Sequence, residues 1–340
     1  MLTDEQCESL RQRILSYRDC ADIPSEEDLM TLLDRTLSVL ESESADYRPS
    51  ASDGSAGGLL DFSRMEECPV VIVPDLHARP DFIINLIHCS FCGESMLSAL
   101  AHDRLFIICV GDGVHAESPV EARERWISSY KEWSENGIID SCTMREEMAD
   151  CFATMMAVME LKNAFPQRFH FLKGNHENIL NQEGGGDHPF RKYALEGAMV
   201  KEFVDSVYGD AVLHLINCFE TALPIVALFR DFGISHAEPF RPYLREEIIN
   251  YHDNGDLILD FTWTGNDQAE SDSCARQFSL LSGREDDGKS LWFGGHRPVD
   301  GKYNLRQNGR YVQIHNPLEM NIAVVSSAER FNPEEDIISI

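Results

Sequence analysis

Five short apolar runs in this 340-residue chain each end in, or lead directly into, a side chain that can bind a metal ion. The runs span 69–77, 105–115, 169–177, 232–239 and 291–298. Read as strands, they put six polar side chains at strand ends or in the loops just after: Asp75, His77, Asp112, Asn175, His236 and His296. Because α/β sheets gather their ligand-binding groups at that edge, the chain is expected to be an α/β protein with a site there.

Two carboxylates, three imidazoles and one amide suit a pair of divalent first-row metal ions. Asp75 and His77 are separated by one residue, so in a loop leaving a strand both can turn to one cation. Asp112 can bridge two ions through its two oxygens. Two ions roughly 3.5–4 Å apart can activate a bridging water and hold a phosphoryl group. The ordered set therefore favours a metal centre over a nucleotide loop or a serine triad.

The charge balance limits the partners. The formal charge of -29, from 29 basic and 58 acidic residues, repels phosphate backbones, so nucleic acid is not an expected partner. Small phosphates remain possible substrates because bound divalent cations reverse the local sign. No apolar run approaches the ~20 residues that span a bilayer, and the N-terminus lacks a secretory signal. We therefore expect a soluble, cytoplasmic protein with no membrane partner.

Residues 1–48 are expected to form a separate helical segment of two short helices. Thr3 and Gln6 form a capping box at the first helix, and Ser25 precedes the second. Apolar stripes follow each cap, at Cys7, Leu10, Ile14 and Tyr17, and at Leu29, Leu32, Leu33, Leu37 and Leu40. The pair is interpreted either as an α-hairpin packed on the main domain or as an arm that docks a protein partner. Residues 49–64, rich in Ser, Gly and Ala, are expected to be a flexible linker.

Residues 65–330 are expected to form the main domain, with a helical insert at about 117–160 and a C-terminal tail at 331–340. Strands and helices alternate early, and further strands follow in ALPIVALF, RYVQIHNP and NIAVV. This order suggests two sheets packed face to face with helices outside.

The order of these motifs resembles that of the calcineurin-like metallophosphoesterases, most closely their phosphoprotein phosphatase branch. That family carries GDxHG, GDxxDRG, GNHE, HGG and GH. Here the corresponding blocks are PDLHA (74–78), GDGVHAE (111–117), GNHE (174–177), SHAEP (235–239) and GGHRP (294–298). The resemblance extends from about Pro69 to Val325. It implies two mixed β-sheets packed as a sandwich and flanked by helices, with a di-metal site at the strand ends.

The resemblance also implies roles for single residues. Asp75, His77 and Asp112 would hold the first metal, and the second would be held by Asp112, Asn175, His236 and His296. His176 would be the general acid that protonates the leaving oxygen. The cofactors would be two divalent ions, with manganese the first candidate and iron, zinc and nickel also compatible.

Several positions depart from the family pattern. Pro74 and Ala78 replace glycines around the first motif, so this loop is expected to be shaped differently. His115 stands where the family has the aspartate that orients the general acid, which makes it the second catalytic candidate. Ala116 replaces a phosphate-binding arginine, and HAE replaces HGG. The Gly-His-x-His of the phosphodiesterase branch is absent because Pro298 takes the last place.

A substrate phosphate still needs a cationic clamp, for which the candidates are Arg276, Arg79 and Arg297. His315 ends a late β-like run and is either a residue that lines the site or a packed loop histidine.

The expected function is metal-dependent hydrolysis of phosphomonoesters, on a phosphoprotein or a small molecule, by a di-metal-activated water with His176 as acid. Two alternatives stay open. One is a dinucleoside polyphosphate or nucleotide hydrolase, or a phosphodiesterase; the other is a non-catalytic binding protein that keeps the fold and some metal.

Overall fold

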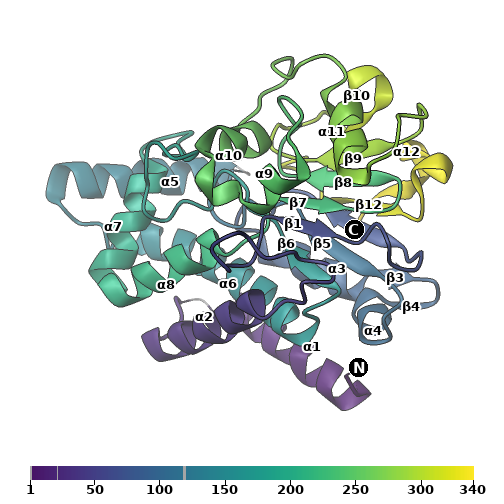
Figure 1. The fold of residues 1–340 in the computed structure, drawn as a ribbon. Coiled ribbons are helices and arrows are strands. Elements are labelled where there is room, and N and C mark those ends of the chain that lie inside the picture. Colours follow the sequence, from purple (N-terminus) through teal and green to yellow (C-terminus); the bar gives the residue numbers. More distant parts are fainter. Residues whose placement is uncertain (1, 21, 118–119) are drawn as a thin grey trace.

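The computed structural model describes residues 2–20, 22–117 and 120–340. Residues 1 and 21 of the N-terminal segment and 118–119 of the expected insert lie outside the described residues. Two mixed sheets pack face to face, and helices cover both outer sides (Figure 1). The α/β sandwich expected from the order of elements is confirmed.

The five-stranded sheet has the order β13 (Ile337–Ser339), β12 (Asn321–Val325), β2 (Val70–Val73), β5 (Phe106–Cys109) and β6 (Phe169–Phe171). The last three strands are parallel neighbours. All three are buried along their whole length, which is typical of parallel strands covered on both faces. Their carboxyl ends therefore open on one edge of the sheet.

The six-stranded sheet has the order β1 (Leu59–Asp61), β7 (Val226–Leu228), β8 (Phe232–Ser235), β9 (Leu291–Gly294), β11 (Tyr311–Gln313) and β10 (Asn304–Arg306). Strands β8, β9 and β11 run parallel. Strand β1 lies within the segment expected to be a linker; it pairs with β7 and buries Leu59 and Leu60 completely. Its two leucines pack on both faces of the strand, which outweighs the Gly- and Ser-rich sequence before it.

A shared apolar layer between the sheets holds them together. Seven helices pack on the outer side of the five-stranded sheet in one continuous cluster: α1 (Asp4–Asp19), α2 (Glu26–Glu41), α3 (Pro80–His88), α4 (Met96–Ala101), α6 (Cys142–Ala164), α7 (Glu196–Tyr208) and α8 (Asp210–Thr221). α5 (Val120–Asn136) joins the same cluster through Ala122 and Trp126. Helices α9 (Arg245–Ile249), α10 (Gly255–Thr262) and α11 (Ser273–Ser282) cover the six-stranded sheet. A short hairpin of β3 (Ser90–Phe91) and β4 (Glu94–Ser95) and the last helix, α12 (Pro333–Asp336), complete the fold.

The N-terminal helix pair begins as its sequence predicts. Thr3 Oγ1 accepts a hydrogen bond from the backbone N–H of Gln6 at 3.2 Å. Gln6 Oε1 in turn accepts a hydrogen bond from the backbone N–H of Thr3. Both helices pack on α6, and α2 also contacts α8. None of the described helices combines the length and apolar character needed to cross a membrane.

Candidate metal centre

The loops that follow β2 and β5 are joined by backbone hydrogen bonds. The N–H groups of Leu76 and His77 donate to the carbonyl of Asp112 at 3.1 and 2.7 Å, and Ala78 donates to Gly113 at 3.0 Å. Because the parent strands are parallel neighbours, their loops leave the same edge together. Asp75, His77 and Asp112 are thereby held in one small volume.

The backbone of this region is strained at several positions. His77, Ala78, Asp112, His115 and His296 have φ values of 45°, 52°, 54°, 72° and 63°, all in the left-handed region. Each such residue costs on the order of 1–3 kcal/mol, and such residues cluster at functional sites. Ala78 keeps a left-handed backbone although it is not a glycine, so the surrounding hydrogen bonds impose the turn on it.

Glu177 fastens the loop after β6 to the loop after β5. Its buried carboxylate accepts the N–H groups of Asp112 at 2.9 Å, Gly113 at 2.9 Å and Gly174 at 2.7 Å. The backbone N–H of His176 donates to Asp112 Oδ1 at 2.9 Å. Glu177, the last residue of the GNHE block, therefore links the two loops and holds Asp112 beside the loop that carries Asn175.

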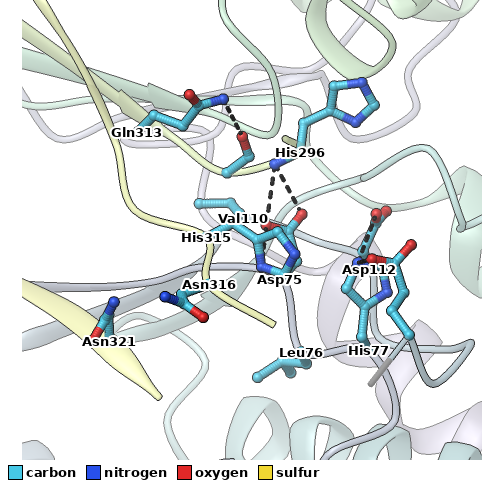
Figure 2. A network of polar contacts seen from close by, with 12 residues as sticks. Asp75, Leu76, His77, Val110, Asp112, His296, Gln313, His315, Asn316 and Asn321 are labelled. Atoms are coloured by element: carbon cyan, nitrogen blue, oxygen red, sulfur yellow. Dashed lines mark hydrogen bonds and ion pairs between the residues drawn. The ribbon is translucent and has the colours of Figure 1, made fainter. Parts of the chain in front are cut away.

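The first group of candidate ligands is Asp75, His77 and Asp112, whose ligand atoms all lie within 4.8 Å of one another (Figure 2). His77 Nδ1 lies 3.4 Å from the carbonyl oxygen of Val114, which directs its Nε2 toward Asp112 Oδ2 at 3.8 Å. A metal-binding histidine commonly donates its other ring N–H to such a carbonyl. A side chain at Gly295 would put its Cβ 2.1 Å from Asp75 Oδ2, so the glycine leaves room for this carboxylate.

The second group is formed by Asn175, His236 and His296. Asn175 Oδ1 lies 2.8 Å from His236 Nε2 and 2.9 Å from His296 Nδ1, and the two nitrogens are 3.2 Å apart. Two ligands of one octahedral ion with bonds of about 2.1 Å are about 3 Å apart, so these three atoms suit a single cation. His236 Nδ1 lies 3.1 Å from the carbonyl oxygen of Val110, the same arrangement as at His77.

Asp112 lies between the two groups, since its Oδ2 is 3.8 Å from His77 Nε2 and 3.5 Å from His236 Nε2. Burial raises the pKa of both Asp75 and Asp112, and the neighbouring carboxylates raise that of Asp112 further. Among the described residues their ion-pair partners are all histidines. Buried carboxylates of this kind need a compensating positive charge. The donor set therefore fits divalent cations.

A second cluster adjoins the first group. Ligand atoms of His77, His115, Glu117 and His176 lie within 4.8 Å of one another. The ring of His176 stacks on Phe190 at 4.5 Å and lies 4.9 Å from that of His115. Burial lowers the pKa of His176 well below its ordinary value, His115 and His77 lower it further, and Glu117 opposes them. The imidazole is thus neutral in this state near pH 7.

Behind His115 lies Glu196, whose Oε1 is 3.7 Å from His115 Nε2. Its carboxylate also accepts three backbone N–H groups, from residues 192–194. Burial would raise the pKa of Glu196, but His115 and these bonds lower it to about 2, so it remains charged.

The three candidate arginines have different surroundings. Arg79 donates to the backbone carbonyls of Asp75, Leu76, Asn316 and Glu319 at 2.7–3.2 Å, so its donors are already used inside the protein. Arg276 forms an exposed ion pair with Glu270 at 2.9 Å. Arg297 is exposed and directly follows His296.

Sequence reasoning did not single out Lys192, Glu196 or the tie made by Glu177. Lys192 Nζ lies 2.8 Å from Glu117 Oε2, and that carboxylate is 3.7 Å from His77 Nε2. Lys192 lies in the segment between β6 and α7 and Glu196 is the first residue of α7; the irregular segment that leads to both has no strand or helix period to signal its position. Glu177 was visible only as part of the GNHE block.

Comparisons with known proteins support the fold. No model of a protein family matches the sequence, and no curated protein is significantly similar to it. The structure is similar to that of a protein serine/threonine phosphatase from Saccharomyces cerevisiae with similarity to human phosphatase PP5. The two share 12% sequence identity over 93% of this chain and 89% of that chain, with a TM-score of 0.57. The chain therefore shares the fold of that phosphatase.

A cold-active protein-tyrosine phosphatase of a psychrophile, Shewanella sp., matches more loosely. It shares 12% identity over 83% of this chain and 82% of that chain, with a TM-score of 0.41.

Proposed function

We propose that this chain is a metal-dependent phosphoesterase that acts on phosphomonoesters. The observation that carries the proposal is the meeting of two candidate ligand groups at Asp112, whose Oδ2 lies within 4 Å of imidazoles from both. Divalent ions bound there would supply an activated water and neutralise charge on the phosphoryl group. The fold is compatible with this activity but does not by itself establish it.

His176 is the proposed general acid. Its Nε2 is 3.8 Å from Asp112 Oδ2, which places it within reach of a group bound beside that carboxylate. The imidazole must be protonated to donate, and an anionic phosphoryl group nearby raises the pKa of a histidine. Stacking on Phe190 and contact with His115 fix the orientation of the ring.

Lys192 is the proposed contact for the substrate phosphate. Its side chain is partly exposed, and its ammonium is paired with the carboxylate of Glu117. A substrate phosphate can take the place of that carboxylate, so the ammonium does not first have to lose a full shell of water. Arg297 is the second candidate. The donors of Arg79 are used by the backbone, and Arg276 is paired with Glu270 at the surface. The ammonium of Lys192 contacts Glu117, whose carboxylate lies 3.7 Å from His77 Nε2.

The test is hydrolysis of para-nitrophenyl phosphate by metal-stripped protein into which Mn²⁺ is titrated. The wild type should gain activity with bound metal, and Asp112→Asn should lose metal and activity together. Asp205→Asn, an exposed change of the same chemistry on α7, is the matched control. Tight binding of two ions by Asp112→Asn would refute the shared carboxylate. Two bound ions with no turnover would move the assignment to phosphodiesters, polyphosphates or a non-catalytic role.

The acid role has its own test. His176→Asn should lower turnover about 100-fold or more, because general acid catalysis typically contributes 10²–10⁴, while the bound metal stays unchanged. The loss should be smaller for substrates whose leaving group needs no proton, such as para-nitrophenol, than for alkyl phosphates. Equal, full activity on both substrates would exclude His176 as the acid.

A further inference from the structure

His315, directly after β11, is a buried imidazole to which the proposed mechanism gives no task. Its side chain is 0% exposed, and neither ring nitrogen has a hydrogen-bond partner among the described residues. A buried polar atom without a partner destabilises the folded state. The neighbouring imidazoles of His77 and His236 are each directed by a backbone carbonyl. Those of His315 and His115 have no such partner in the described part of the chain, and a bound ion would satisfy a ring nitrogen of His315.

The position of the ring indicates what that ligand is. His315 Nδ1 lies 3.2 Å from Asp75 Oδ2, and its ring centroid is 5.2 Å from that of His77 (Figure 2). The nitrogen and oxygen are close, yet their directions do not make a hydrogen bond, since Nδ1 has no such partner. Two donor atoms about 3 Å apart that do not point at each other have the geometry of neighbouring ligands of one ion.

The backbone around His315 is fixed relative to Asp75. Arg79 donates to the carbonyl of Asp75 at 2.7 Å and to that of Asn316 at 3.2 Å, so one guanidinium joins the two loops. The N–H of Val299 donates to the carbonyl of His315 at 2.8 Å, which ties β11 to the loop that carries His296. The imidazole is therefore preorganised beside the first ligand group.

We propose that Nδ1 of His315 is an additional ligand of the first metal position, beside Asp75, His77 and Asp112. The inference rests on the proposed metal centre and goes beyond it by adding a ligand from the loop after β11, which none of the five motifs contains. With two carboxylates and two imidazoles, the first position would suit iron, zinc, cobalt or nickel better than an all-oxygen site would. Its ring proton would then be on Nε2.

The test uses Co²⁺ alone, added to the metal-free full-length protein. Each coordinated imidazole keeps one ring N–H, which Co²⁺ shifts far outside the ordinary proton NMR range. With His77, His236, His296 and His315 as ligands, the wild type should show four such exchangeable signals and two bound cobalt ions. His315→Asn should show three, and it should bind one ion at least about 10-fold more weakly. His170→Asn, a buried imidazole in another cluster, should keep all four.

Two other outcomes are distinguishable. Three signals in wild type and His315→Asn alike, with two cobalt ions bound to each, would overturn the role of His315 and leave the proposed function intact. Failure of the wild type to bind cobalt at all would instead refute the metal centre. The wild-type count is informative even where His315→Asn does not fold.

Discussion

At the scale of single residues, the geometry of the centre depends on side chains that would not touch the metals. Glu177 is the clearest case. Its carboxylate gathers three backbone N–H groups from two loops, and it is only 2% exposed. A charged acceptor forms stronger hydrogen bonds to converging N–H groups than a neutral acceptor does. The position of Asp112 therefore depends on a carboxylate that no ion needs to contact.

Glu177→Gln replaces one accepting oxygen with an NH₂ group that faces N–H donors. We expect the free energy of unfolding to fall by about 1–3 kcal/mol and Mn²⁺ affinity to fall about 10- to 100-fold, as for other groups that orient metal ligands. Urea denaturation and equilibrium metal binding measure the two effects. Glu183→Gln, at a side chain 78% exposed, should change neither. Unchanged metal affinity in Glu177→Gln would show that Asp112 is positioned without this tie.

The residues at the centre fall into two sets, those at the ends of strands and those placed by an irregular segment. The six predicted ligands each follow an apolar run, and the parallel order of the strands makes those ends meet. Lys192 lies in the irregular segment between β6 and α7, and Glu196 begins α7 directly after that segment. Their contacts to Glu117 and His115 depend on a path that has no repeating pattern. Sequence reasoning could therefore predict the ligand groups but not the charges around them.

At the scale of elements, strands with continuous apolar runs were predictable, including the edge strand β6, and edge strands without such a run were not. All eight apolar runs identified in the sequence became strands. β10 was missed because it is an exposed edge strand without a buried face. β13 was missed because its place in the sheet is given by pairing with β12. Such edges are specified by their neighbours rather than by their own composition.

A buried ionic cluster joins the N-terminal segment to α6 and β6. Glu43 contacts Arg48 and Lys162, and His170 Nδ1 lies 3.1 Å from Lys162 Nζ and 3.3 Å from Glu43 Oε1. Burial, together with the charge of Lys162, lowers the pKa of His170 to about 4. Burial raises the pKa of Glu43, but Lys162, His170 and Arg48 lower it by more, so its net pKa is well below the ordinary value. This junction is therefore expected to respond to acid.

Between pH 6.5 and 4 the unfolded chain binds a proton at His170 that the folded chain does not, so stability rises with pH across this window. The folded protein should accordingly lose up to about 3 kcal/mol of stability from this group as the pH falls from 7 to 4. Loss of the Glu43 contribution adds to this below its unfolded pKa. Urea denaturation at a series of pH values measures the slope. His170→Asn should flatten it between pH 6.5 and 5; an unchanged slope would place the acid sensitivity elsewhere.

At the scale of the whole molecule, the apolar stripes of the N-terminal helices belong to the core of the sheet. Leu10, Ile14, Leu29, Leu33 and Leu40 are at most 4% exposed and form one cluster with strands β2 and β5. Because each helix buries only one face, neither could hold its conformation alone. Packing on the main body thus accounts for these stripes. A partner-docking role would have to use other surfaces of the pair.

Leu33→Ala tests whether this segment unfolds with the rest of the protein. Leu33 is 2% exposed, and truncating a buried leucine costs about 2–5 kcal/mol. We expect the entire urea transition to move to lower concentration. Far-ultraviolet circular dichroism, which reports the helices, and fluorescence, which reports the four tryptophans, all outside residues 2–43, should shift together. Leu318→Ala, at a side chain 77% exposed, should leave both unchanged. An early loss of helical signal with the fluorescence midpoint unmoved would mean that residues 2–43 fold as an independent unit, and the single continuous core would then be wrong.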